Sequence, residues 1–383
     1  MDMQDDLRGR QPCRRGQRQQ PWSGWRPAAA LLLAVLLAAC QGAATPAVPA
    51  ATQPETSPLP PPQVYTPTAA ATATGSPTPT EVVPTPTPTE NPYAGLGIDD
   101  LAERSYGGGQ IQVHETLEDN AYFTRYLISY PSDGLEIYGF ANIPKLGEPP
   151  YPVVIALHGY INPAIYNTLD YTTGYADSLA VAGFLVLHPN LRGFPPSEEG
   201  ENLFRVGMAV DVLNLISLVR EWGGQEGLLA SAEPGTVGLW GHSMGGGIST
   251  RVITVDPQIR AAVLYGAMSG DERKNFERIF QYFSDGTRGL DELAVPIEAL
   301  GRISPVNFLE RIQAAVSLHH GENDGEVPLE WAEDTCARLQ ALQKEVECFT
   351  YPGQPHTFRG EGNDLFIQRT IEFFNTHLKR PSD

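Results

Sequence analysis

One serine of this sequence has surroundings typical of a nucleophile. Ser243 lies in the segment Gly241-His242-Ser243-Met244-Gly245, between a strand-like apolar run and a helix-like segment. A G-x-S-x-G motif in this context forms a sharp turn, and its two glycines remove Cβ atoms that would obstruct the turn. The serine then projects above the edge of a sheet, and the adjacent helix N-terminus favours a developing oxyanion. The motif therefore predicts nucleophilic attack by Ser243 on a carbonyl group.

A serine hydroxyl is a weak nucleophile unless a base removes its proton and a third group orients that base. Among the eight histidines, His356 follows the last predicted strand and so emerges at the same sheet edge as Ser243. His242 lies inside the motif, where its ring must point away from the reaction. We therefore predict that His356 is the base.

The orienting carboxylate is expected in the loop after the preceding strand, at residues 320–328. Asp324 is the preferred candidate because the flanking glycine-rich turn suits a short carboxylate. Glu322 and Glu326 are alternatives in the same loop.

Two backbone N–H groups are candidates for an oxyanion hole. His158-Gly159-Tyr160 follows the first central strand, and Met244 follows the nucleophile. The N–H groups of Tyr160 and Met244 are expected to converge on the carbonyl oxygen of the substrate. This chemistry implies no metal and no organic cofactor.

Short apolar runs alternate with amphipathic segments along the chain, which predicts an α/β fold with a mostly parallel central sheet and helices on both faces. Two period-two segments come first, as expected of hairpin strands at a sheet edge. The predicted strands are 123–130, 135–142, 153–157, 185–188, 237–240, 261–265, 314–318 and 346–351, and the predicted helices are 171–182, 210–222, 246–254, 330–342 and 365–377.

Residues 269–312 interrupt this alternation and are expected to form a helical lid across the site. The segment carries large apolar residues that could line an acyl pocket or pack the lid onto the sheet. These residues are Phe276, Ile279, Phe280, Tyr282 and Phe283.

Residues 123–383 resemble the catalytic domain of the prolyl oligopeptidase family, within the α/β-hydrolases. The matching segments are Tyr151-Pro152-Val153-Val154 into His158-Gly159, Asn190-Leu191-Arg192-Gly193, Gly241-His242-Ser243-Met244-Gly245-Gly246, His320-Gly321 through Asp324 to Val327-Pro328, and Tyr351-Pro352-Gly353 to His356. The resemblance implies an α/β-hydrolase fold with Ser243 as nucleophile, Asp324 as orienting acid and His356 as base. It also implies that Arg192 is structural or adjacent to substrate, although a surface salt bridge fits it equally well.

The resemblance implies a serine hydrolase that acts through an acyl-enzyme on a small ester or a short peptide. Members with well-defined peptidase action usually carry an N-terminal β-propeller, and a Pro/Thr-rich segment stands in that place here. We expect a peptidase without a propeller, with a carboxylesterase of the same fold as the alternative. A non-catalytic surface binding protein is a third hypothesis, and it predicts the loss of a triad member.

The N-terminal residues have the layout of a secretory signal. Six arginines precede an apolar stretch at residues 28–39, and Cys40 follows directly. This stretch has 12 residues, whereas a membrane-spanning helix needs about 20. Leu37-Ala38-Ala39-Cys40 resembles a bacterial lipobox, so we expect cleavage after residue 39, lipidation of Cys40 and an extracytoplasmic protein anchored to a bacterial membrane. An ordinary cleaved signal with an incidental Cys40 is the alternative.

Composition divides the rest of the chain into two parts. Residues 40–104 are expected to form a Pro/Thr-rich disordered tether that begins with the lipidated cysteine, because this stretch is too poor in large apolar residues to bury a core. Residues 105–383 are expected to form one catalytic domain.

Cys336 and Cys348 remain as a pair if the leader is removed and Cys40 is lipidated. A helix at 330–342 and a strand at 346–351 would place the two cysteines at similar distances from the turn that joins the helix to the strand, which allows a disulfide. Two separate buried thiols are an equal alternative.

The net charge of −19 and the lack of a basic run beyond the leader argue against nucleic acid as a partner. The oligomeric state is left open.

Overall fold

The computed structural model describes residues 91–379. In this part of the chain, nine strands form one sheet in the order β1-β2-β3-β5-β4-β6-β7-β8-β9. The strands are β1 (Gln112–Asp119), β2 (Phe123–Ser132), β3 (Leu135–Pro144), β4 (Tyr151–Leu157), β5 (Leu185–Pro189), β6 (Ala232–His242), β7 (Ala261–Tyr265), β8 (Ala315–Gly321) and β9 (Val346–Tyr351).

Helices connect these strands, and most of the longer ones were expected from the sequence. The α-helices are α1 (Ile98–Glu103), α2 (Thr173–Val181), α3 (Val206–Trp222), α4 (Met244–Val255), α5 (Glu272–Arg278), α6 (Leu290–Leu293), α7 (Ile297–Ile303), α8 (Leu329–Ala341) and α9 (Gly360–Leu378). Short helices are η1 (Pro163–Ile165), η2 (Leu203–Arg205), η3 (Ile279–Phe283), η4 (Pro305–Asn307) and η5 (Leu309–Arg311).

The predicted α/β-hydrolase architecture is confirmed. The edge strands β1 to β3 are antiparallel to their neighbours, whereas β5, β4, β6, β7, β8 and β9 run parallel to one another. The hairpin of β2 and β3 was expected, but β1 was not. Residues of β1 are mostly polar and exposed, so this strand has little of the hydrophobic alternation that identifies a strand from sequence.

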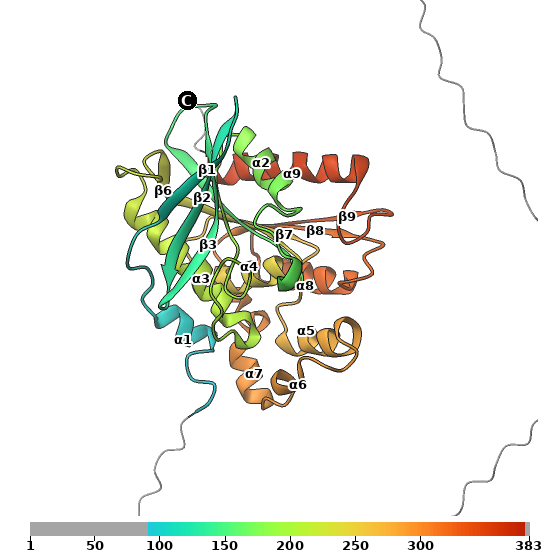
Figure 1. Ribbon diagram of the computed structural model, residues 1–383. Coiled ribbons are helices and arrows are strands. Elements are labelled where there is room, and N and C mark those ends of the chain that lie inside the picture. The colour runs from blue at the N-terminus through green and yellow to red at the C-terminus, as the bar shows by residue number, and fades with distance from the viewer. Residues whose placement is uncertain (1–90, 380–383) are drawn as a thin grey trace, which may run out of the picture. The chain divides into compact units, whose positions relative to one another are not determined.

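The central strands are buried on both faces. In β4, Val153 and Ile155 contribute to one hydrophobic cluster, and Val154 and Ala156 contribute to the other. Successive side chains of a strand point to opposite faces, so the two clusters are the two layers that cover the sheet. Figure 1 shows α2 and α9 together on one side, and α3, α4 and α8 on the other. All parallel strands therefore end at one common edge.

The prediction that the tether extends to residue 104 is wrong for the last part of that range. Residues 98–103 form α1, and its Ile98 and Leu101 are fully buried in the core. Burying one such side chain stabilises a fold by roughly 1.5–3 kcal/mol, which is enough to hold a short helix against the domain. The packed domain therefore begins before residue 105.

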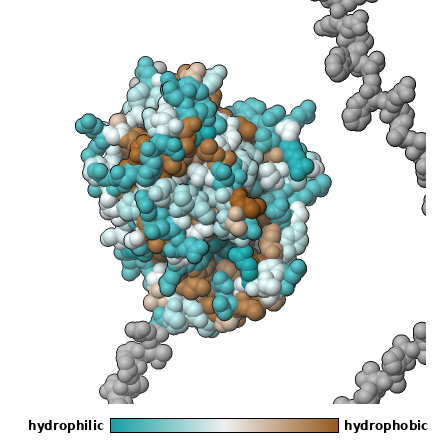
Figure 2. All heavy atoms as spheres, viewed as in Figure 1, coloured by the Kyte–Doolittle hydropathy of each residue, from teal (hydrophilic) through white to brown (hydrophobic). Residues whose placement is uncertain are grey.

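The segment 269–312, between β7 and β8, contains three α-helices and three short helices. Phe276 is buried in the hydrophobic core, whereas Tyr282 and Phe283 are about half exposed. Among the large apolar residues of this segment, Phe276 therefore packs into the core, whereas Tyr282 and Phe283 lie at the surface. Leu290 and Ile297 are also exposed, and Figure 2 shows hydrophobic residues on the surface around α6 and α7.

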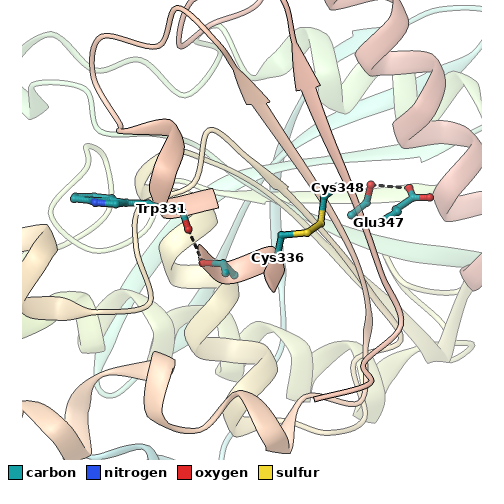
Figure 3. The surroundings of a disulfide bond; sticks show 6 residues. Trp331, Cys336, Glu347 and Cys348 are labelled. Atoms are coloured by element: carbon teal, nitrogen blue, oxygen red, sulfur yellow. Dashed lines mark hydrogen bonds between the residues drawn. A yellow bond between two sulfur atoms is a disulfide. The ribbon is translucent and has the colours of Figure 1, made fainter. Parts of the chain in front are cut away.

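Cys336 in α8 and Cys348 in β9 form a disulfide, with their Cα atoms 6.4 Å apart (Figure 3). The bridge links α8 to the edge strand β9. The similar distances of the two cysteines from the turn between these elements had allowed this pairing.

The expected signal peptide, Cys40 and most of the expected tether lie outside the described residues. Within residues 91–379, no helix has the length and apolar character needed to cross a bilayer.

Candidate active site

Ser243 occupies a strained turn between β6 and α4. Its backbone angles are φ 55° and ψ −114°, a backbone conformation that residues other than glycine rarely adopt. A Cβ on Gly241 would lie 2.4 Å from the carbonyl oxygen of Gly245, and one on Gly245 would lie 2.3 Å from that of Leu157. Glycine is therefore required on both sides of the serine for steric reasons, as the motif predicted.

His356 and Asp324 are joined by a hydrogen bond. Nδ1 of His356 lies 2.7 Å from Oδ2 of Asp324. The Asp324 side chain is fully buried and that of His356 is 7% exposed. A carboxylate can only accept, so Nδ1 carries the proton and Nε2 is left free to act as a base.

Every described contact of Asp324 favours its ionised form. Oδ1 accepts hydrogen bonds from the backbone N–H groups of Glu326 and Val327, at 2.8 and 2.9 Å. Burial alone raises the pKa of Asp324, but the hydrogen bonds from His320 and His356 outweigh it and lower the pKa below its ordinary value. The site therefore holds a permanent negative charge behind His356.

The two alternative carboxylates, Glu322 and Glu326, do not contact Nδ1 of His356. Glu322 accepts a hydrogen bond from the hydroxyl of Thr350. Glu326 lies on the opposite side of the imidazole from Asp324, with Oε2 3.7 Å from Nε2 of His356. Among the three candidates, only Asp324 contacts Nδ1.

Ser243 lies beside this pair, but no hydrogen bond joins Ser243 Oγ to His356 within residues 91–379. The backbone N–H of Ser243 donates to the carbonyl of Tyr265 at 2.9 Å. The next residue, Gly266, packs against the imidazole, because a Cβ there would lie 3.1 Å from Nδ1 of His356. Catalytic hydrogen bonds are often long in free enzymes and shorten when substrate binds.

The expected oxyanion donors lie on the two segments that flank Ser243. A Cβ on Gly159 would lie 3.1 Å from Cβ of Ser243, so the segment that carries Tyr160 runs directly beside the serine. Met244 is the first residue of α4, where an N–H has no partner within the helix. In the described part of the chain, neither the Met244 nor the Tyr160 N–H donates a hydrogen bond.

Two arginines connect the segment 269–312 to the loops of the site. Nη1 of Arg288 donates to the hydroxyl of Tyr160 at 2.9 Å. Arg278 donates to the backbone carbonyls of Gly325 and Glu326, at 2.7 and 2.9 Å. The segment therefore contacts both the loop after β4 and the loop that carries Asp324.

The structure places three further residues here, of which His242 had been expected to point away from the reaction and the other two had been assigned no role. Nε2 of His320 donates to the carbonyl of Val327 at 3.0 Å and lies 3.2 Å from Oδ2 of Asp324. Tyr171 and His242 contact each other next to Ser243. His320 could have been found because it stands in the loop already identified, whereas Tyr171 lies in no motif.

Arg192 is structural. Its guanidinium is buried and hydrogen-bonds the carboxylate of Asp211 from Nε and Nη2, with the Nη2 distance 2.8 Å. The sequence had left open a surface salt bridge, and burial contradicts that alternative.

Comparisons with known proteins identify the family of this chain. The model of the prolyl oligopeptidase family matches residues 174–381. The uncharacterized peptidase YtmA of Bacillus subtilis is 26% identical over an alignment of 255 residues, and the match covers 65% of this chain and 92% of that protein. The uncharacterized peptidase YuxL of the same organism is 23% identical, and the match spans 70% of this chain but only 42% of YuxL.

Solved structures show the same fold. Acetyl xylan esterase 1 from Thermoanaerobacterium superimposes with a TM-score of 0.51 and 20% identity, covering 74% of this chain and 92% of that one. The acylaminoacyl peptidase of Pyrococcus horikoshii gives a TM-score of 0.53 and 21% identity, covering 68% of this chain and 43% of that one.

Proposed function

The chain belongs to the prolyl oligopeptidase family and is a serine hydrolase, and from this premise we propose that Ser243, His356 and Asp324 are its catalytic triad. The observation that carries the proposal is the 2.7 Å contact between His356 and Asp324, formed at the sheet edge where Ser243 occupies its strained turn. The three residues follow the chain order Ser, Asp, His of α/β-hydrolases.

In the first step, Oγ of Ser243 attacks the carbonyl carbon of the substrate, and Nε2 of His356 takes the hydroxyl proton. Asp324 holds the ring through Nδ1 and stabilises the imidazolium that forms. The N–H groups of Met244 and Tyr160 stabilise the oxyanion, where loss of one donor costs about 3–4 kcal/mol of transition-state stabilisation. The imidazolium then gives its proton to the leaving amine or alkoxide, which leaves an acyl group on Ser243.

In the second step, His356 takes a proton from water, and the hydroxide attacks the acyl group. The tetrahedral intermediate collapses, Ser243 receives the proton back and the acid is released. Every proton in this scheme passes through Nε2 of His356.

We propose a peptidase without a propeller as the first substrate class, because the family and the curated relative YtmA both carry peptidase names. A carboxylesterase is the second candidate. The observation that favours it is that the acetyl xylan esterase has this fold over 92% of its own length.

The segment 269–312 is proposed to act as the lid of this site. The hydrogen bonds of Arg278 and Arg288 support this role, because they join the segment to the loops that flank Ser243. The exposed rings of Tyr282 and Phe283 are candidates for contact with an apolar acyl group.

A fluorophosphonate probe tests the nucleophile. Wild-type protein should be labelled, Ser243→Ala should not, and Ser178→Ala should be labelled like wild type because Ser178 lies on α2 and its hydroxyl donates to the carbonyl of Gly174 in the same helix. Equal labelling of wild type and Ser243→Ala would overturn the assignment. Absence of labelling in all three would favour the non-catalytic binding protein.

Parallel kinetics on aryl esters and short blocked peptides test the substrate class. Turnover of both classes supports the peptidase, and turnover of esters alone supports the carboxylesterase.

We also propose that Cys40 is lipidated and anchors an extracytoplasmic protein to a bacterial membrane. The support is the sequence alone, with residues 28–39 apolar and Cys40 directly after them. In a bacterial host, the mature protein should sediment with membranes and carry an N-terminal diacylglycerol by mass spectrometry. Cys40→Ser should lose both properties, and retention of both would contradict the proposal.

A further inference from the structure

Tyr171 and His242 form a chain of hydrogen bonds between three loops of the active site. Gly159 N lies 3.0 Å from Oη of Tyr171, and Oη lies 2.6 Å from Nδ1 of His242. At its other end, Nε2 of His242 lies 3.1 Å from the backbone carbonyl oxygen of His356. The chain therefore connects the oxyanion segment, the nucleophile turn and the loop of the base.

The chemistry of these groups allows only one placement of protons. The carbonyl of His356 can only accept, so Nε2 of His242 carries a proton. Burial, with a smaller contribution from His356, lowers the pKa of His242 to about 3, so its ring is neutral and Nδ1 is an acceptor. Tyr171 must then donate to Nδ1, and its oxygen accepts the N–H of Gly159. Burial raises the pKa of Tyr171, which keeps the hydroxyl protonated.

Each contact fixes a group that the reaction needs in position. Gly159 precedes Tyr160, so holding the Gly159 N–H restrains the segment that presents the Tyr160 N–H. Holding the carbonyl of His356 restrains the backbone of the base, while Asp324 restrains its ring through Nδ1. His356 thus has two anchors, His242 at the end of β6 for its backbone and Asp324 in the loop after β8 for its ring.

The surrounding packing leaves little freedom to these groups. The ring of His242 lies 4.6 Å from that of His356 and 4.3 Å from that of Tyr265, measured between centroids. The Tyr171 ring meets His242 edge to face at 5.5 Å. A Cβ on Gly159 would lie 2.6 Å from Oη of Tyr171, so the hydroxyl fits against bare backbone.

We propose that Tyr171 and His242 are positioning residues that align the oxyanion segment and His356 with Ser243. Within residues 91–379, neither side chain hydrogen-bonds Oγ of Ser243 or Nε2 of His356. The inference rests on the proposed function, because it assigns a role in aligning that triad and oxyanion hole. Misplacing a catalytic group by about 1 Å can lower a rate by about a hundredfold, so loss of the alignment should lower kcat more than it raises KM.

The first test is Tyr171→Phe, which removes one oxygen and keeps the ring. We expect kcat for an aryl ester to fall by about 10- to 100-fold, with KM changed by less than about twofold. The matched control is Tyr166→Phe. The Tyr166 hydroxyl bonds the side chain of Asn190 in the same region and takes no part in the hydrogen bonds that link Gly159, Tyr171, His242 and His356. The control should keep kcat within about threefold of wild type. Equal kcat for Tyr171→Phe and Tyr166→Phe would overturn the proposal.

A second pair of variants keeps the proposal testable if Tyr171→Phe does not fold. His242→Gln retains one donor and one acceptor, whereas His242→Leu retains neither. We expect kcat to be at least about tenfold higher for His242→Gln than for His242→Leu, at similar KM and similar thermal midpoint. Equal kcat values for the two would contradict the positioning role.

Wild-type controls separate this inference from the proposed function. If wild-type protein neither hydrolyses esters nor reacts with a fluorophosphonate at Ser243, the proposed function fails. If wild type does both and the variants keep its kcat, the function stands and the positioning role fails.

Discussion

The imidazole of His356 and the carboxylate of Asp324 share a hydrogen bond of 2.7 Å, although 32 residues separate them in the chain. The pair is formed because His356 follows β9 and Asp324 follows β8, and these neighbouring strands are parallel. Their carboxyl ends lie at the same edge of the sheet, so two polar loops meet behind the proposed nucleophile.

Replacing Asp324 tests this relationship. Asp324→Asn keeps the shape but removes the charge that holds Nδ1–H, so kcat should fall by about 10⁴-fold. Steady-state kinetics on an aryl ester measures the effect. Glu322→Gln is the matched control, because Glu322 bonds Thr350 and not His356. An Asp324→Asn enzyme as active as this control would show that another group orients the base.

Gly159 has a steric role that alanine substitution tests. A methyl group there would lie 2.6 Å from the Tyr171 hydroxyl and 3.1 Å from Cβ of Ser243, so the oxyanion segment must move. We expect Gly159→Ala to lower kcat by at least about 100-fold. Gly174→Ala is the control, because a Cβ there meets nothing within 4 Å. Similar kcat values for the two variants would contradict the prediction.

The disulfide should stabilise the domain without affecting the chemistry. Cys336 and Cys348 are 12 residues apart, and a loop of this size corresponds to about 3 kcal/mol of unfolding free energy. The Cys336→Ala/Cys348→Ala protein should therefore unfold at lower urea concentration, with kcat within about twofold of wild type. Wild type under reducing conditions should match the double variant. An unchanged midpoint in both would contradict this account.

Stability should fall as the pH is lowered from neutrality. Burial lowers the pKa values of His188, His242 and His319 to about 3 in the folded protein. An unfolded histidine has a pKa near 6.5, so unfolding takes up protons between about pH 6.5 and pH 3. Each of the three histidines should cost about 2 kcal/mol of stability at pH 5 relative to pH 7.5.

Urea unfolding near pH 7.5 and near pH 5 measures this loss. His319→Gln should show a smaller difference between the two pH values than wild type. His114→Gln is the control, because His114 lies on the exposed strand β1, and it should behave like wild type. A wild-type midpoint that does not fall near pH 5 would disprove the prediction.

Local patterns in the sequence were sufficient to predict the architecture and the order of the proposed triad along the chain. Apolar runs such as those of β4 and β7 have to be buried on both faces, which determines a parallel sheet between helices. Parallel strands share one edge, so polar motifs that follow them are placed together. Ser243, Asp324 and His356 could be named for this reason.

The sequence was less informative where burial is incomplete or contacts are distant. The polar strand β1 shows little hydrophobic alternation, and α1 has only two buried residues. The sequence preferred Asp324 over Glu322 and Glu326 on turn chemistry alone, and only the structure shows that its carboxylate reaches Nδ1 of His356.

The contacts of Tyr171 and His242 required the tertiary structure. Tyr171 and His242 are 71 residues apart, and His242 and His356 are 114 apart. Hydrogen bonds between such distant positions depend on packing and leave no periodic signal in the chain. The sequence determines which segments become strands and where reactive side chains emerge, and the folded protein determines which of these side chains contact one another.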